Sequence, residues 1–82
     1  MYADNRNIER EAMRRIVEAV AAKQGMSATG WAKAHGFTTG DISPKNTKSM
    51  TLDTMFRLCR ALDVKPSRFV DALEKVRGEN GL

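Results

Sequence analysis

Apolar residues recur along much of the chain at intervals of three and four positions, the repeat of one buried helix face. In the first third of the chain they are Met13, Ile16, Val17 and Val20. This pattern predicts a first helix with Asn7 as its N-cap and Gly25 as a left-handed stop. Arg10 and Arg14 lie mostly off the apolar stripe, as do Arg15 and Glu18.

A shorter second helix is predicted from Ser27, a residue that can cap it, to Gly36. Gly30 lowers its intrinsic stability by roughly 1 kcal/mol relative to alanine, so tertiary packing must hold this helix in place. Trp31 is interpreted as a core residue that faces the first helix.

A third segment begins at Thr38, with Asp41 three residues later in the pattern of a capping box. Ile42 is its predicted inward anchor. Pro44 has no amide N–H and biases Ser43 away from helical angles. The third helix is therefore predicted to span one to two turns and to be kinked or broken near Ser43.

Two amphipathic helices are predicted after the polar loop 45–49. Thr51 caps the fourth, whose apolar side is predicted to hold Leu52, Met55, Phe56, Leu58, Cys59 and Leu62. Pro66 begins the fifth, with the apolar residues Phe69, Val70, Leu73 and Val76. No strand pattern and no internal repeat occurs, so the predicted fold class is all-α, with five helices in one domain over residues 7–77. Residues 1–6 are predicted to be a flexible arm and residues 78–82 a flexible tail.

Composition narrows the functional classes. The 82 residues carry a formal charge of +4, which suits a polyanionic partner such as nucleic acid. The single cysteine, Cys59, excludes an intrachain disulfide, and the single histidine, His35, leaves no Cys/His set for zinc. Cys59 is expected to be a buried apolar residue, and His35 to interact with the C-terminus of the second helix. No catalytic arrangement converges and no cofactor is implied, so an enzyme is the weakest reading.

Two short helices joined by His35-Gly36-Phe37-Thr38 form a helix-turn-helix signature. The sequence resembles the Cro and phage-repressor family of helix-turn-helix regulators, also called the XRE or lambda-repressor-like family. The resemblance covers roughly residues 7–76. Its matching residues are Gly25-Met26-Ser27, Trp31-Ala32, Gly36-Phe37-Thr38, Ile42-Ser43, Leu52-Asp53-Thr54, Leu58, Ala61-Leu62, Val64 and Phe69.

The resemblance implies a five-helix bundle and a transcriptional regulator, expected to be a repressor, that binds double-stranded DNA. The DNA-binding positions that it implies are Ser27, Lys33, Thr38, Thr39, Gly40, Asp41, Ser43, Pro44, Lys45, Asn46 and Lys48. Lys45 to Lys48 resemble the family's phosphate-binding turn, and Lys33 and Arg57 extend the basic rim. The expected location is the cytoplasm, because no segment predicts a membrane span or a signal peptide.

The third helix departs from the family pattern. Gly40 and Pro44 offer no hydrogen bond to base edges, and the charge of Asp41 is repelled by phosphate. Ala28 replaces the glutamine that usually pins a phosphate. Sequence discrimination then depends on Thr39, on a displaced Lys45 or Asn46, on the N-terminal arm or on DNA shape.

Two functions stay open. The first is a homodimeric regulator on an inverted-repeat operator, with Phe69, Val70, Leu73 and Val76 as the predicted dimer face. Core packing against the first helix is the alternative role for Phe69 and Leu73, so Val70 and Val76 are the preferred dimer residues. The second function is a protein-interaction module, such as an antitoxin or antiactivator, that keeps the fold with weakened base reading.

Overall fold

The computed structural model describes residues 7–81, and all regular structure in this range is helical. The all-α prediction is confirmed. The elements are α1 (Ile8–Lys23), α2 (Ala28–Ala34), η1 (Thr39–Ile42), α3 (Leu52–Leu62) and α4 (Pro66–Glu79). The third of the five predicted helices is thus a single turn of 3-10 helix, so the described part has four α-helices and η1. The arm predicted over residues 1–6 lies outside the described residues.

Local capping chemistry sets where the helices begin. The side chains of Asn7, Ser27 and Thr51 accept hydrogen bonds from the backbone N–H groups of Arg10, Gly30 and Thr54. Gly25 adopts a φ of 71° just after α1, as predicted. Pro66 is the first residue of α4, where its missing N–H costs nothing. The structure confirms each of these predicted boundaries. They could be predicted because each depends only on residues close in the sequence.

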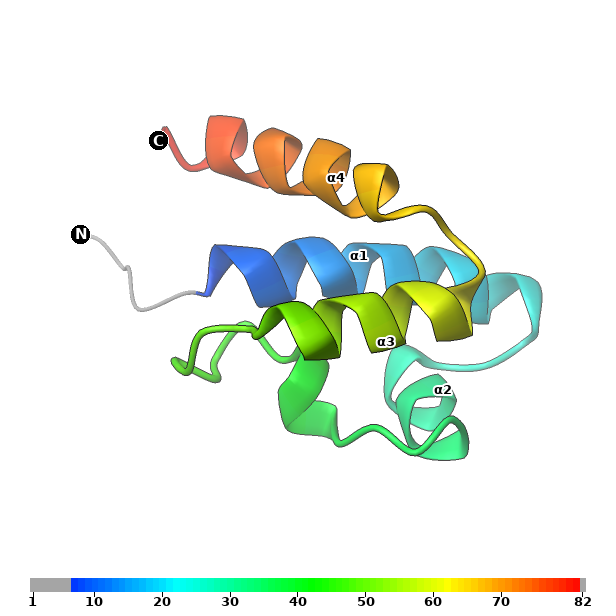
Figure 1. Ribbon diagram of the computed structural model, residues 1–82. Coiled ribbons are helices and arrows are strands. Elements are labelled where there is room, and N and C mark those ends of the chain that lie inside the picture. The colour runs from blue at the N-terminus through cyan, green and yellow to red at the C-terminus, as the bar shows by residue number, and fades with distance from the viewer. Residues whose placement is uncertain (1–6, 82) are drawn as a thin grey trace.

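Helix α1 is the central element of the fold. It contacts α4 along one side and both α2 and η1 along another, and α3 packs against α4 (Figure 1). Trp31, Met13 and Ile16 are buried at the centre, with at most 2% of their surface exposed. This confirms the core position of Trp31. The indole N–H of Trp31 has no hydrogen-bond partner among residues 7–81.

Helix α3 differs from its predicted amphipathic pattern. Met55, Leu58 and Cys59 are buried, but Leu52 is 71% exposed and Phe56 is 48% exposed. The prediction that the latter two lie on the buried side was wrong. Helical spacing groups all six apolar residues within a broad stripe, whereas the contacts of α3 cover only part of it. Burial raises the pKa of the Cys59 thiol, in agreement with its expected role as an apolar core residue.

Helix α4 corrects two further predictions. Phe69 and Val76 are buried in the core, which removes them from the predicted dimer face, whereas Val70 is 47% exposed and Leu73 is half-buried. The helix also continues through Gly78 to Glu79, beyond the predicted boundary at residue 77. Glu79 closes the end of α4 onto α1 through ion pairs with Arg15 at 2.6 and 2.9 Å.

Candidate nucleic-acid interface

A tight turn joins α2 to η1 and fixes the direction in which η1 leaves the core. Gly36 has a φ of 82°, and the N–H of Phe37 donates to the carbonyl of Ala32 at 2.8 Å. The buried ring of Phe37 stacks on Trp31 with 6.0 Å between centroids. The ring of His35 also stacks on Trp31, with 4.2 Å between the ring centroids. Its Nδ1 lies 2.9 Å from the carbonyl oxygen of Trp31, which confirms the interaction predicted at the end of α2.

Segment η1 is held at both ends, which explains why it forms although it is short. Thr38 Oγ1 accepts from the N–H of Asp41 at 3.3 Å, and Asp41 Oδ2 accepts from the N–H of Thr38 at 3.0 Å. The predicted capping box is therefore present. Ile42 is fully buried. Ser43, which precedes Pro44, is extended with a ψ of 122°, so the segment ends where the proline restricts its neighbour.

The predicted DNA-binding residues divide by exposure into two groups. The exposed group consists of Ser27, Lys33, Thr38, Thr39, Lys45 and Lys48. The half-buried group consists of Gly40, Asp41, Ser43, Pro44 and Asn46. Thr39 and the three lysines form no hydrogen bond or ion pair through their side chains within residues 7–81 and extend into solvent. These four side chains are free to contact a partner.

Several of the other predicted residues already hold the protein's own backbone. The hydroxyl of Ser27 caps α2, and the hydroxyl of Ser43 accepts from the N–H of Lys45 at 3.3 Å. Asn46 donates through Nδ2 to the carbonyl of Gly40 at 2.9 Å and accepts through Oδ1 from the N–H of Lys48 at 3.1 Å. The side chain of Asn46, predicted to be a phosphate ligand, is therefore engaged as a brace between η1 and the loop 45–49.

The same loop is attached to the start of α1 by Asn7. Its backbone N–H donates to the carbonyl of Pro44 at 2.8 Å. Its side-chain amide donates to the carbonyls of Asn46 at 3.1 Å and Lys48 at 2.8 Å. The residue that caps α1 thus also fixes the loop, which lies about forty positions later in the chain.

Arg10 is a residue of this site that the sequence pattern did not reveal. It is only 6% exposed, and its guanidinium donates to the carbonyls of Gly40, Asp41, Lys48 and Ser49 at 2.9 to 3.4 Å. Within the described range it forms no ion pair, so its positive charge is compensated there only by carbonyl dipoles. Arg10 fixes η1 and the end of the loop in one geometry and adds positive potential near both.

Arg57 on α3 borders the same surface from the other side. Its guanidinium carbon lies 5.3 Å from the centre of the Phe37 ring, within cation–π distance, and Asp53 approaches it at 3.8 Å. The ring contact restrains a cation beside the α2–η1 turn. Arg57 therefore lies beside the α2–η1 turn, where Asp53 offsets part of its charge.

Two features were searched for in the described range, a cluster of metal ligands and a membrane-spanning helix. No group of three or more His, Cys, Asp or Glu side chains within it could hold a metal ion. None of the helices described is long and apolar enough to cross a membrane. Comparisons with protein-family models, with curated proteins and with solved structures find no match to this chain.

Proposed function

We propose that this protein is a DNA-binding transcriptional regulator, expected to be a repressor, whose main contacts to the duplex come from the loop 45–49 and the start of η1. The observation that carries the proposal is the loop itself. It presents Lys45 and Lys48 to solvent on a backbone that Arg10, Asn7 and Asn46 hold in place. A rigid basic loop loses little conformational entropy when its lysines meet phosphates.

Two further features support a duplex as the polyanion. Helix α2, the Gly36 turn and η1 follow each other in the order of a helix-turn-helix motif, with Ile42 anchoring η1 in the core. The chain also carries a net charge of +4. Lysine–phosphate contacts position a protein on DNA and give affinity that falls as salt rises, without reading sequence.

Base reading is assigned mainly to Thr39. It is exposed in the first position of η1, and its hydroxyl can donate or accept a hydrogen bond at a base edge. A four-residue 3-10 turn is only about 8 Å long. It can therefore offer few side chains to a major groove. We infer that the shape and deformability of the DNA contribute much of the sequence preference.

Selection from a random duplex pool at moderate salt tests this function. Enrichment of an inverted repeat with half-sites about one helical turn apart is the expected result. The double variant K45A/K48A should lower the magnitude of the salt slope of log affinity by about two. The matched control is K75A, which removes a lysine of α4 outside this interface. No retention of any duplex at any salt would overturn the proposal.

A protein-interaction module is the second candidate, and the geometry of Asp41 favours it. Its carboxylate lies at the start of η1, on the segment that would have to approach phosphates. Asp41→Asn separates the two functions. It should strengthen duplex binding if the protein binds DNA, because a repulsive charge is removed, and should leave duplex binding absent if the surface serves a protein partner.

A further inference from the structure

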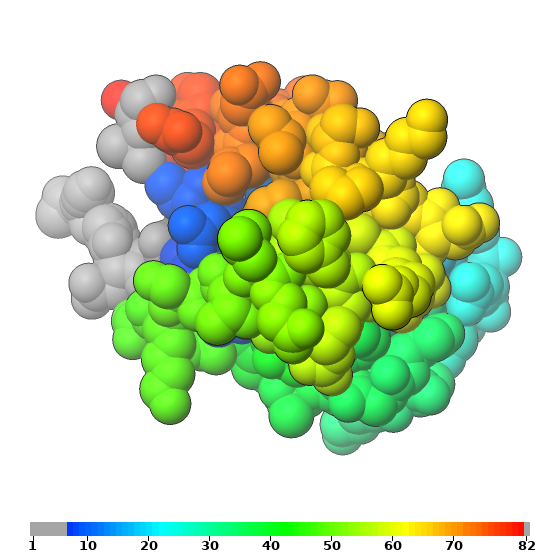
Figure 2. All heavy atoms as spheres, viewed as in Figure 1, coloured from blue at the N-terminus to red at the C-terminus, as the bar shows by residue number. Residues whose placement is uncertain are grey.

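A groove of about 380 Å³ lies between α1 and α4, here called the α1–α4 groove. In Figure 1, α1 lies between α4 and η1. Figure 2 shows α4 and the α2–η1 segment on opposite sides of α3. The α1–α4 groove is therefore separate from the candidate nucleic-acid interface, and a ligand bound in it leaves η1 and the loop 45–49 uncovered.

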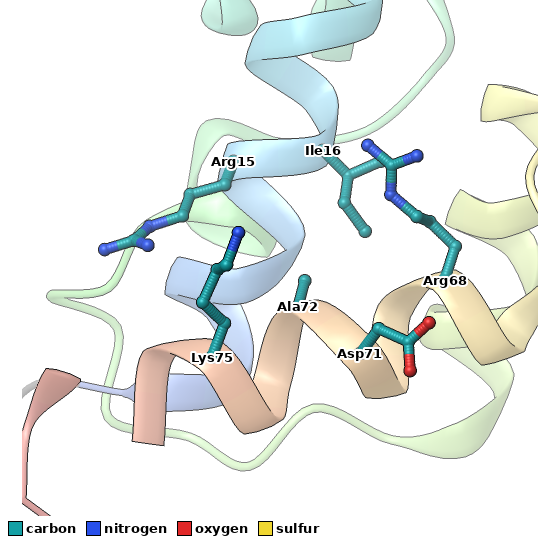
Figure 3. A pocket seen from close by; sticks show the side chains of 6 residues that line it. All are labelled: Arg15, Ile16, Arg68, Asp71, Ala72 and Lys75. Carbon is teal, nitrogen blue, oxygen red and sulfur yellow. The ribbon is translucent and has the colours of Figure 1, made fainter. Parts of the chain in front are cut away.

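The α1–α4 groove has an apolar floor and a charged rim (Figure 3). The buried Ile16 of α1 and the half-buried Ala72 of α4 form the floor. Because the side chain of Ala72 is a single methyl group, α4 leaves room over this floor. The rim consists of Arg15, Arg68, Asp71 and Lys75.

Two cations of the rim are free to meet a ligand. The side chains of Arg68 and Lys75 both extend from α4 toward α1, on either side of Ala72 (Figure 3). Both residues are exposed, and neither forms an ion pair within residues 7–81. They are seven positions apart, which is two helical turns, or about 10 Å along α4.

The other charges at the groove leave these two cations unpaired. Arg15 is held by Glu79 at 2.6 Å and by Glu11 at 2.9 Å, so its charge is compensated. The hydrogen bond from Arg15 and, more weakly, the charge of Lys75 lower the pKa of Glu79, but the carboxylate of Glu79 is bonded to Arg15. The carboxylate of Asp71 points away from Lys75 (Figure 3).

We propose that the α1–α4 groove binds an amphipathic acidic helix of a partner protein. Such a helix presents residues i, i+3, i+4 and i+7 on one face. Carboxylates at i and i+7 have the same two-turn spacing as Arg68 and Lys75, because both pairs follow the helical repeat. An apolar residue at i+3 or i+4 then lies over Ile16 and Ala72, so the ligand matches the floor and the rim together.

Two other occupants match the groove less well. A nucleic-acid backbone would use the two cations, but it would leave the apolar floor without a partner and would meet the carboxylate of Asp71 on the rim. A small molecule would stay largely in solvent, because the rim residues of α4 are exposed, whereas small-molecule sites enclose most of their ligand.

Fluorescence anisotropy with a labelled synthetic peptide tests the site. The probe is an alanine-rich helix of about 15 residues with glutamates at i and i+7 and leucines at i+3 and i+4. Its dissociation constant should be about 10 to 100 μM, as expected for a small interface. R68E and K75E should each raise this constant about tenfold. R77E is the matched control, since Arg77 is an exposed cation of α4 outside the groove lining, and should change it less than about threefold.

Charge exchange identifies the pairing. The double variant R68E/K75E should lose the acidic peptide, and it should bind a peptide with lysines at i and i+7 to within about threefold of the original affinity. Circular dichroism should show an unchanged fold, since both side chains are exposed. Absence of binding at about 1 mM, or equal losses in K75E and R77E, would overturn the proposal. A larger loss of duplex affinity in K75E than in R77E would overturn it too, because the groove would then bind phosphates.

Parallel measurements of duplex binding let this inference and the proposed function fail separately. Peptide binding by a protein that retains no duplex supports the groove and overturns the DNA-binding function. Duplex binding without peptide binding does the reverse. Simultaneous binding rests on the proposed function: saturating duplex should leave the peptide dissociation constant within about threefold. Displacement of the peptide by duplex would overturn the groove as its site.

Discussion

The two sides of α1 are held to the rest of the chain by different means. Toward α4, α1 offers the buried Ile16, which lines a groove with Ala72 of α4, and Arg15, which forms an ion pair with Glu79. Toward η1 and the loop 45–49, it offers Asn7 and Arg10, and the contact consists of hydrogen bonds from these two side chains to backbone carbonyls. One side gives the domain its stability, and the other gives a polar loop a defined shape.

This difference teaches how a chain of 82 residues can present a rigid polar surface. A loop of lysine, asparagine, threonine and serine has little apolar surface to bury, so the hydrophobic effect cannot order it. A buried guanidinium can, because its five N–H donors reach several carbonyls at once. We therefore expect substitutions on the α4 side to change stability more than binding, and those on the loop side to change binding more than stability.

Ile16→Ala is the substitution with the largest expected effect on stability. Ile16 is 2% exposed between α1 and α4, so the loss of its side chain should leave a cavity and lower the free energy of unfolding by about 3 kcal/mol. Urea unfolding monitored by circular dichroism measures this loss. The duplex affinity of the folded protein, measured well below the unfolding midpoint, should stay within about threefold. A much larger loss of affinity would show that the two sides of α1 are not independent.

Arg10→Met is expected to change duplex affinity more than stability. It leaves carbonyls without their donor and should lower the free energy of unfolding by about 2 kcal/mol. Because the loop loses its fixed shape, duplex affinity should fall at least tenfold. Arg14→Met is the control, since Arg14 is half-buried and pairs only with Glu18, at 3.1 Å, within the described range. Equal affinities for the two variants would mean that the geometry of the loop does not matter for binding.

Asn46→Ala tests how the loop is held, with a smaller expected loss of stability than Arg10→Met. It removes the two side-chain hydrogen bonds that connect η1 and Lys48, which should cost about 1 kcal/mol of stability. Hydrogen exchange at the N–H of Lys48 should accelerate, because its acceptor is lost. An unchanged exchange rate at Lys48 would show that Asn7 and Arg10 suffice to hold the loop.

Capping was the part of the fold that the sequence predicted best. Asn7, Ser27, Thr38 and Thr51 each accept from the N–H group three residues ahead, so local sequence contains both partners. The limit that Pro44 sets on the third segment is equally local. Periodicity was less informative for α3, where Leu52 and Phe56 share the apolar register but stay exposed because no helix within residues 7–81 covers them.

The role of Arg10 could not be predicted from the sequence. Its carbonyl partners lie 30 to 39 positions away in the chain, and a guanidinium off the apolar stripe of a helix is expected in solvent. Asn46 was expected to contact phosphate because Lys45 to Lys48 resemble the family's phosphate-binding turn, and this resemblance does not show that its amide bonds to Gly40 and Lys48 in the folded chain. At the candidate site the exposed lysines were predictable from local sequence, whereas the residues that shape their backbone depend on contacts that form only in the folded chain.

Glu79→Gln should have the smallest effect on the free energy of unfolding. The dependence of this effect on pH can be used to measure it. The hydrogen bond from Arg15 holds the pKa of Glu79 below its ordinary value of 4.5. A carboxylate whose pKa is lowered by folding contributes stability above that ordinary value and loses it as pH falls through the folded pKa. The difference in unfolding free energy between the original chain and E79Q should therefore be small and constant near neutrality. It should shrink as the pH falls below about 4.5. It should also be smaller in high salt, which screens the ion pair. Asp71→Asn is the control, since Asp71 also lies on α4 and forms no ion pair within residues 7–81. A difference for E79Q that persists unchanged to pH 3 would mean that the contact of α4 with α1 does not depend on this ion pair, and that apolar burial alone holds that side of the molecule.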